Sequence, residues 1–159
     1  MDKFQRLQCV INFRISMLYY KVFLYKSLQI GKGVSFRKHF SINIGKNGHI
    51  EIGGGCFFNQ YCSLNAHTLI KIGENCLFGE NVKVYDHNHG YKDLSRLIKN
   101  QEFTTAPIFI GNNCWISSNC VILKGVTIGD NCVIGAGCII YKDVPANSVI
   151  INKQVLSVL

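Results

Sequence analysis

"IGNNCWISSNCVILKGVTIGDNCVIGAGCIIYKDVPANS", residues 110–148, carries an isoleucine at every sixth position, at Ile110, Ile116, Ile122, Ile128, Ile134 and Ile140. An α-helix repeats about every 3.6 residues and a simple strand every 2, so neither explains this spacing. Glycine follows several of these isoleucines. A period of six with such glycines is typical of short strands joined by tight turns and stacked coil upon coil, as in a parallel β-helix.

The same pattern extends toward the N-terminus, where its apolar positions are Ile52, Phe58, Leu64, Ile72, Phe78 and Val84. Seven of the eight cysteines lie four positions after such a residue, where valine stands in other repeats. They are Cys56, Cys62, Cys76, Cys114, Cys120, Cys132 and Cys138. We expect them to point inward as small buried side chains. No C-x₂-C pair occurs, so no metal site is expected, and stacked thiols favour a reducing compartment.

Composition narrows the class of protein further. The length of 159 residues predicts one domain. Lys and Arg number 17 against 9 Asp and Glu, a formal charge of +8 that favours an anionic partner. Cations scattered singly along the repeat make a nucleic acid the weakest candidate. The sequence also shows no signal-peptide pattern and no uncharged run of about 20 residues.

Residues 110–148 resemble the C-terminal coils of the hexapeptide-repeat acyltransferases, which include galactoside, maltose and surface-polysaccharide O-acetyltransferases. The resemblance covers residues 30–148 and is densest over 72–148. It implies an all-β fold, a left-handed parallel β-helix of about five coils. It also implies acetyl-CoA as cosubstrate and a homotrimer whose active sites lie between subunits.

A coil in this family has three six-residue sides, so equivalent positions in successive coils differ by 18 in number. The offset from Ile110 to Ile128 is 18 and that from Ile52 to Ile72 is 20, whereas that from Ile72 to Ile110 is 38. The surplus of 20 predicts a solvated loop over residues 89–109, and a loop of this length inside a compact domain is usually functional. The expected organisation is an N-terminal cap (1–28), the β-helix (29–148) and a C-terminal tail (149–159).

The stretch "VKVYDHNHGY", residues 82–91, interrupts the repeat with two histidines. Taking Val84 and Asn88 as inward positions places His87 and His89 outward. The resemblance aligns His87 with the family's catalytic histidine, and a neutral imidazole can take the proton of an attacking hydroxyl. Asp86 or His89 would orient the ring or contact the acceptor. Two surface histidines in a turn is the plainer alternative.

The γ-class carbonic anhydrases share the fold and bind zinc with three histidines, but His67, His87 and His89 do not reproduce their spacing. By resemblance Ser118 supplies a backbone N–H to the oxyanion, and Asn59 binds the acceptor. The remaining cofactor-binding candidates are Trp115, Ala136, Tyr141 and Lys142. The family's Gly-x-Pro-Ala after the last coil is absent from "INKQVLSVL", residues 151–159, where Lys153 would replace the usual basic residue.

Residues 1–28 lie outside the repeat and place apolar residues at helical spacing among cations, which predicts a basic amphipathic helix. Such a helix could cap the open end of the β-helix or lie against the inner face of a membrane, and we favour the cap. The chain is therefore expected in the cytoplasm, with peripheral membrane contact as the second interpretation.

The expected function is acetyl transfer from acetyl-CoA to a sugar hydroxyl, free or lipid-linked, in surface-polysaccharide synthesis. Direct attack is expected, because the cysteines that could form an acyl-enzyme point inward. An amino-sugar N-acetyltransferase and a catalytically silent β-helix assembly subunit remain as alternatives.

Overall fold

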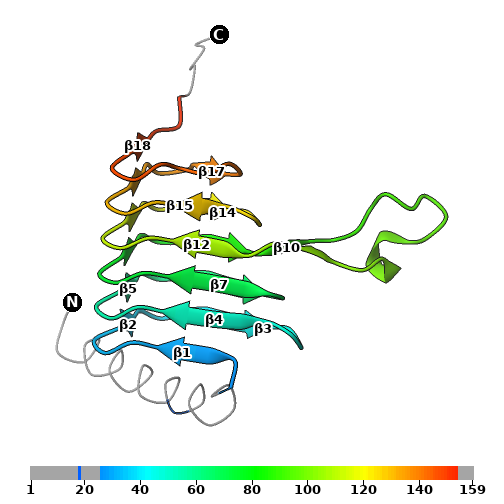
Figure 1. Cartoon of the computed structure of the whole chain (residues 1–159), viewed down its shortest axis with the longest axis horizontal. Helices are drawn as coiled ribbons and strands as arrows, with labels where there is room; N and C mark the ends of the chain where they lie inside the picture. Colours follow the sequence, from blue (N-terminus) through cyan, green and yellow to red (C-terminus); the bar gives the residue numbers. More distant parts are fainter. Residues whose placement is uncertain (1–17, 19–25, 154–159) are drawn as a thin grey trace.

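The computed structural model describes residue 18 and residues 26–153 of the chain. Most of the expected N-terminal helix, Cys9 and residues 154–159 lie outside the described residues. Within the described part the chain winds into stacked triangular coils with a parallel sheet on each side, as Figure 1 shows. Five coils are complete, and a bridge from Ile128 to Val144 followed by β18 begins a sixth.

Each sheet collects one side of every coil. The first sheet contains β1 (Leu28–Ile30), β4 (His49–Ile52), β7 (Leu69–Ile72), β12 (Ile108–Ile110) and β15 (Thr127–Ile128). The second contains β2 (Ser35–Phe36), β5 (Phe57–Phe58), β8 (Leu77–Phe78), β13 (Trp115–Ile116), β16 (Val133–Ile134) and β18 (Val149–Ile150). The third contains β3 (Ser41–Ile44), β6 (Ser63–Ala66), β9 (Lys83–Tyr85), β14 (Val121–Ile122) and β17 (Ile139–Ile140).

The strand register confirms the spacing expected from the sequence. Ile52 pairs with Ile72, and Ile110 pairs with Ile128, each pair joining one turn of the helix to the next. Ile72 pairs directly with Ile110, although the segment between them is about twice as long as in the other pairs. The surplus leaves the coil as one excursion, which projects sideways from the stack in Figure 1.

The core is the inward column of repeat residues. All twelve apolar repeat positions are at most 5% exposed, and the seven described cysteines that share the inward slot are buried and free. Several of their thiols donate to backbone carbonyls of the next coil, as Cys114 Sγ does to Gly129 O at 3.1 Å. The expected packing role of the cysteines is confirmed.

Asparagine shapes the corners of the coils. Asn75, Asn81, Asn113, Asn119, Asn131 and Asn147 have φ between 52° and 62°. Asparagine tolerates this left-handed conformation better than most residues, so the chain can turn sharply between sides. Several of these side chains also bond across coils, as Asn113 Nδ2 does to Asn131 Oδ1 at 2.9 Å.

The excursion begins and ends earlier than expected. It runs from His87 to Thr105, where β10 (His87–Asn88) and β11 (Thr104–Thr105) form an antiparallel ribbon. The ribbon closes where Ala106 N donates to Asp86 O at 2.9 Å. A short 3₁₀ helix, η1 (Ile98–Asn100), lies near the tip, and residues 91–100 are all exposed, which confirms the expected solvated loop.

Candidate active site

Two corners of the triangular coil carry the candidate residues. We name the corner after the third sheet the histidine corner, formed by residues 65–67, 85–87, 123–125 and 141–143. The corner before the third sheet is the serine corner, formed by residues 59–60, 79–80, 117–118 and 135–136. The register of β9, β14 and β17 aligns the rows of the first corner, and that of β8, β13 and β16 aligns the second.

Asp86 is the buried anchor of the histidine corner. Its side chain has 0% exposure, and its carboxylate accepts the backbone N–H of His67 at 2.8 Å and of Thr68 at 2.7 Å. Both donors belong to the preceding coil. The expectation that Asn88 points inward is wrong, because Asp86 continues the alternation of buried Val82 and Val84 while Asn88 is exposed on the ribbon.

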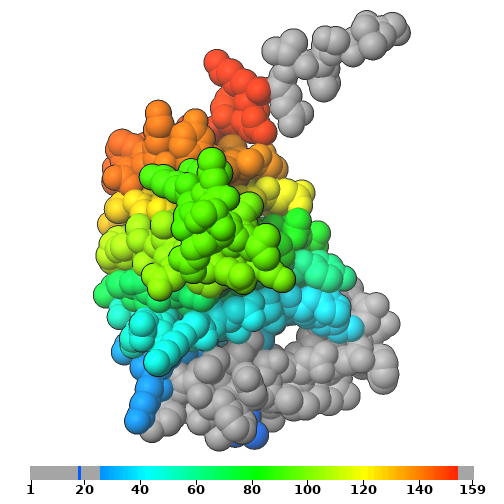
Figure 2. Space-filling view, turned by 90° about the vertical axis from the view of Figure 1, so that its right-hand side faces the viewer, coloured from blue at the N-terminus to red at the C-terminus, as the bar shows by residue number. Residues whose placement is uncertain are grey.

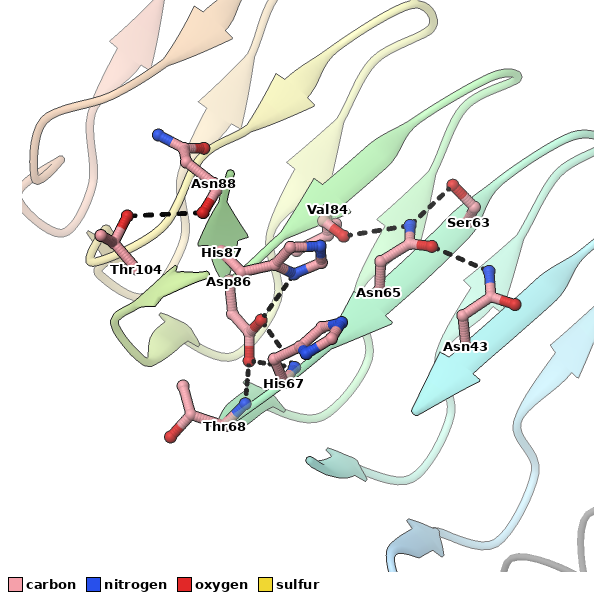
Figure 3. Close-up of polar contacts among 10 residues, drawn as sticks. All are labelled: Asn43, Ser63, Asn65, His67, Thr68, Val84, Asp86, His87, Asn88 and Thr104. Carbon is pink, nitrogen blue, oxygen red and sulfur yellow. Dashed lines mark hydrogen bonds and ion pairs between the residues drawn. The ribbon is translucent and has the colours of Figure 1, made fainter. Parts of the chain in front are cut away.

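The same carboxylate orients His87, as Figure 3 shows. His87 Nδ1 lies 3.1 Å from Asp86 Oδ1. An ionised carboxylate can only accept, so in the neutral imidazole this contact assigns the proton to Nδ1 and leaves the lone pair on the other nitrogen, Nε2. The His87 side chain is 15% exposed, enough for a substrate to reach it. The arrangement can remove a proton from a hydroxyl.

An aromatic cluster surrounds the His87 ring. The His67 ring centroid lies 4.1 Å from that of His87, and Phe103 of the excursion contacts His67, His87 and His89 at 4.4, 5.0 and 4.6 Å. Burial, followed by the charges of His87 and His89, lowers the pKa of His67 from 6.5, with Asp86 acting in the opposite direction. His89 is exposed and lies farther along the ribbon.

A pocket of about 410 Å³ opens beside His87. Its polar lining is Asn43, Asn65, His67 and His87, and we name it the amide-lined pocket. Asn43 Nδ2 donates to Asn65 Oδ1 at 2.8 Å, and Asn65 Nδ2 donates to Ser63 Oγ at 3.2 Å, so the amides are held in place (Figure 3). Fixed amide and imidazole groups around a basic nitrogen suit a ligand rich in hydroxyls.

At the serine corner Ser118 has an unused backbone donor. At these corners a side chain of the next coil can accept a backbone N–H. Ser118 Oγ accepts Glu80 N at 3.1 Å in this way, and at another corner Asp130 Oδ1 accepts Asn112 N at 2.6 Å. The residue stacked on Ser118 in the next coil is Ala136, which has no side-chain acceptor. Among the described residues Ser118 N–H therefore has no hydrogen-bond partner.

The other candidates divide between the corners. Trp115 is 49% exposed on the second sheet, which confirms its outward direction, and Ala136 follows Ser118 in the serine corner. Asn59 also lies there and accepts Arg37 Nη1 at 3.2 Å. Tyr141 and Lys142 lie at the histidine corner, two coils beyond Asp86, with Lys142 Nζ 5.8 Å from the tyrosine ring. Lys153 is exposed beyond β18.

One chain does not bring the two corners together. Ser118 precedes the third sheet, whereas His87 follows it, and about five residues of extended chain, on the order of 15 Å, lie between the corners. A base and an oxyanion donor must both lie about 3 Å from the reacting group. The serine corner of a second copy would have to approach His87 to complete such a site.

The sequence did not lead us to expect His67 beside His87. The coil length could have shown this contact, because Asn65 pairs with Tyr85 in this part of the β-helix and His67 therefore lies one coil before His87. In the described residues no group of three or more His, Cys, Asp or Glu side chains could hold a metal ion. No helix within the same part of the chain combines the length and apolarity needed to cross a membrane.

Comparison with known proteins identifies the family. Residues 107–142 match the bacterial transferase hexapeptide (six repeats), and residues 69–84 match the hexapeptide repeat of succinyl-transferase. A solved galactoside acetyltransferase in complex with coenzyme A is 30% identical, with 94% of this chain and 78% of that one covered and a TM-score of 0.60. The chain belongs to the hexapeptide-repeat acyltransferase family. This confirms the expected left-handed β-helix.

One curated protein and a second solved structure are also similar to this chain. Galactoside O-acetyltransferase of Escherichia coli (strain K12) is 37% identical over 101 residues, which are 64% of this chain and 49% of that protein. A hexapeptide-repeat acetyltransferase from Vibrio cholerae, solved with acetyl-coenzyme A, is 30% identical, with 76% of this chain and 64% of that one covered and a TM-score of 0.67. This chain spans about half the length of the curated relatives it matches.

Proposed function

We propose that this hexapeptide-repeat protein transfers an acetyl group from acetyl-CoA to a sugar hydroxyl, in the synthesis of a surface polysaccharide in the cytoplasm. The observation that carries the proposal is the Asp86–His87 pair, in which Nδ1 lies beside a buried carboxylate and the imidazole lines a pocket with Asn43 and Asn65. The galactoside O-acetyltransferase relative and the coenzyme A complexes of similar structures support the acceptor and the donor.

The proposed mechanism is direct attack. His87 Nε2 takes the proton of the acceptor hydroxyl while the oxygen bonds to the thioester carbonyl carbon. The backbone N–H of Ser118 donates to the oxygen that gains negative charge. The carbon–sulfur bond then breaks, and His87 returns its proton to the departing thiolate of coenzyme A.

The proposal includes a homotrimer. His87 of one chain and Ser118 of its neighbour form each site, because the two corners are separated within a chain. The second sheet carries an exposed apolar row along its paired strands, formed by Leu77, Trp115 and Val149. A neighbouring copy would cover this row. Trp115, Ala136, Tyr141 and Lys142 are proposed to line the coenzyme channel, and Lys153 to approach its nucleotide. Asn59 and His89 are proposed to contact the acceptor.

The test compares His87→Ala with His49→Ala, since His49 is an exposed histidine that does not line the pocket. Calorimetry measures acetyl-CoA binding, and release of free thiol measures transfer to a panel of hexoses and amino-sugars. We expect His87→Ala to keep its acetyl-CoA affinity and to lose about 10² to 10⁴-fold in kcat, with His49→Ala unchanged. Transfer to amines alone would identify an N-acetyltransferase. No acetyl-CoA binding by the native chain would favour the silent assembly subunit.

A further inference from the structure

The excursion is held in a defined shape by its own hydrogen bonds. Beyond the ribbon, Gly90 N donates to Glu102 O at 3.0 Å, and a Cβ on Gly90 would lie 2.6 Å from that oxygen. Gln101 Nε2 donates to the carbonyl oxygens of Asp93 and Arg96 at 2.9 and 3.1 Å, and its Oε1 accepts Asp93 N at 3.2 Å. The two arms of the excursion are therefore tied together near the tip.

A second pocket, of about 540 Å³, lies between this excursion and the histidine corner of the following coil. It is distinct from the amide-lined pocket, with which it shares no residue. Lys92 and Arg96 line it from the excursion, Lys124 lines it from the coil, and His89 from the ribbon. Figure 2 shows the excursion in front of the coils to which Lys124 belongs.

The cations of this second pocket are not neutralised by the described part of the chain. Lys92, Arg96 and Lys124 form no ion pair there, and Arg96 Nη2 donates to the uncharged carbonyl oxygen of Asn100. Asp93 lines the pocket too, but Ser95 N at 3.0 Å and Ser95 Oγ at 2.6 Å occupy its Oδ1. The other acid in the lining is Glu102. Three cations and an imidazole against two carboxylates favour a bound anion.

The position of the pocket indicates which substrate carries that anion. The pocket reaches His89, two residues from the proposed base. Of the residues proposed for the coenzyme, Trp115, Ser118 and Ala136 lie at or before the serine corner. Tyr141 and Lys142 lie at the histidine corner one coil beyond Lys124, and neither lines this pocket. We infer that the acceptor sugar carries a phosphate or carboxylate group, which Lys92, Arg96 and Lys124 bind while the sugar occupies the amide-lined pocket beside His87. This inference rests on the proposed function and specifies its substrate class.

The test compares each hexose of the acceptor panel with its 1-phosphate and its hexuronic acid. The variants are Lys92→Gln/Lys124→Gln and Arg96→Lys, which keeps the charge. Lys99→Gln is the matched control, because Lys99 is an exposed lysine of the same excursion that does not line the pocket. Hydrogen bonds between charged groups are the strong ones, so the native chain should prefer the anionic acceptor by about tenfold or more in kcat/KM.

The expected result is that Lys92→Gln/Lys124→Gln removes this preference and leaves kcat/KM for the neutral hexose and the affinity for acetyl-CoA unchanged. Lys99→Gln and Arg96→Lys should retain the preference. Equal loss in the Lys99→Gln control, or a native preference for the neutral hexose, would overturn the inference. Weaker acetyl-CoA binding by the double variant would overturn it as well, because the cations would then serve the donor.

Direct binding separates failure of this inference from failure of the proposed function. Titration of hexose 1-phosphate followed by NMR, at low salt because screening weakens such contacts (Debye length about 10 Å at 0.1 M), requires no acetyl transfer. If no acceptor is acetylated but hexose 1-phosphate binds to the native chain and not to the double variant, the anion site stands and the transferase proposal fails. If hexose 1-phosphate does not bind, the anion site fails. A higher kcat/KM for a prenyl-phosphate-linked hexose than for the free 1-phosphate would identify a lipid-linked source.

Discussion

The carboxylate of Asp86 lies 3.1 Å from His87 Nδ1 and is completely buried, yet it belongs to the adjacent residue in the chain. Adjacent side chains in a regular strand point to opposite faces. Asp86 continues the inward alternation of Val82 and Val84, whereas His87 is only partly buried. Asp86 also accepts two backbone N–H groups from the coil before. The position of His87 is thus linked to the stacking of two coils.

Asp86→Asn should abolish most of the activity through the tautomer of His87. The N–H groups of His67 and Thr68 require an acceptor, so the introduced amide would turn its oxygen to them and its NH₂ to His87 Nδ1. The proton of His87 would then move to Nε2, which could no longer act as a base. We expect kcat to fall about 10² to 10⁴-fold at unchanged acetyl-CoA affinity, measured by thiol release and calorimetry.

Asp130→Asn is the matched control for that substitution. Asp130 also accepts a backbone N–H from the preceding coil, that of Asn112, but at a corner away from the histidines. Its activity should stay within about twofold of the native chain. Comparable activity in Asp86→Asn and Asp130→Asn would show that Asp86 has a structural role only.

Stability should fall in acid because of His67. Burial and then His87 lower its folded pKa below 6.5, so the unfolded chain binds more protons than the folded chain. The stabilisation is fully present above about pH 6.5 and is lost as pH falls through the folded pKa. His67→Gln removes this contribution. Urea midpoints at pH 7.5 and 5.5 should therefore differ less for His67→Gln than for the native chain, with exposed His49→Gln as control.

An equal change of the urea midpoint with pH in the native chain and in His67→Gln would contradict this prediction. The titratable groups that face His67 remain in the variant and contribute to the pH dependence of both chains; they are Asp86, His87 and His89. A steeper dependence in His67→Gln would mean that His67 is more readily protonated in the folded state than in the unfolded one.

Asn65→Ala should weaken acceptor binding rather than chemistry. The Asn65 side chain lines the amide-lined pocket, but it forms no hydrogen bond with His87 Nδ1 or the Asp86 carboxylate. Losing one or two hydrogen bonds to a hydroxyl costs about 1 to 2 kcal/mol, so KM for the acceptor should rise about five- to thirtyfold at constant kcat. Asn113→Ala, which removes an asparagine ladder contact at another corner, should leave KM unchanged. A fall in kcat alone would place Asn65 with the base instead.

The β-helix was predictable because its repeat is local. Ile110 and Ile116 occupy the same inward position on successive sides of one coil, so the period appears in the sequence without knowledge of any partner. The inward cysteines were predictable for the same reason. The burial of Asp86 was not, because it depends on the N–H groups of His67 and Thr68, which reach it only once two coils have stacked.

The candidate site was predictable only in part. The break in the repeat indicated His87 and the excursion, and the resemblance indicated Ser118. The free N–H of Ser118 depends on Ala136 standing one coil later in the same row, which follows from the coil length. The separation of Ser118 from His87 follows from which side of the triangle each residue occupies. The amide-lined pocket could not be predicted. Asn43 pairs with Asn65 only because the coil between them is longer than three six-residue sides.

Cys120→Val tests whether the cysteine thiol nearest Ser118 in the chain participates in acetyl transfer. Cys120 is the cysteine nearest Ser118 in the chain, is 0% exposed, and burial raises the pKa of its thiol. A thiol in this state is a poor nucleophile. Val82 occupies the same column one coil earlier, so Cys120→Val should cost less than about 1.5 kcal/mol of stability and keep full activity. Detection of an acetyl-cysteine by mass spectrometry of the quenched native reaction would contradict direct attack.

Gly79→Ala should damage the serine corner selectively. A Cβ at Gly79 would lie 2.5 Å from Ser118 N and 2.8 Å from Ser118 Oγ, so the backbone donor proposed for the oxyanion must shift. Gly53→Ala is the matched control, because its Cβ would lie 2.5 Å from the backbone of Gly73 at a corner that carries no candidate residue. Overpacking of this kind costs about 1 to 3 kcal/mol, so both variants should lose similar stability in urea. Only Gly79→Ala should also lose about 10² to 10³-fold in kcat, the usual effect of removing an oxyanion donor, and equal kcat in the two variants would exclude Ser118 from that role.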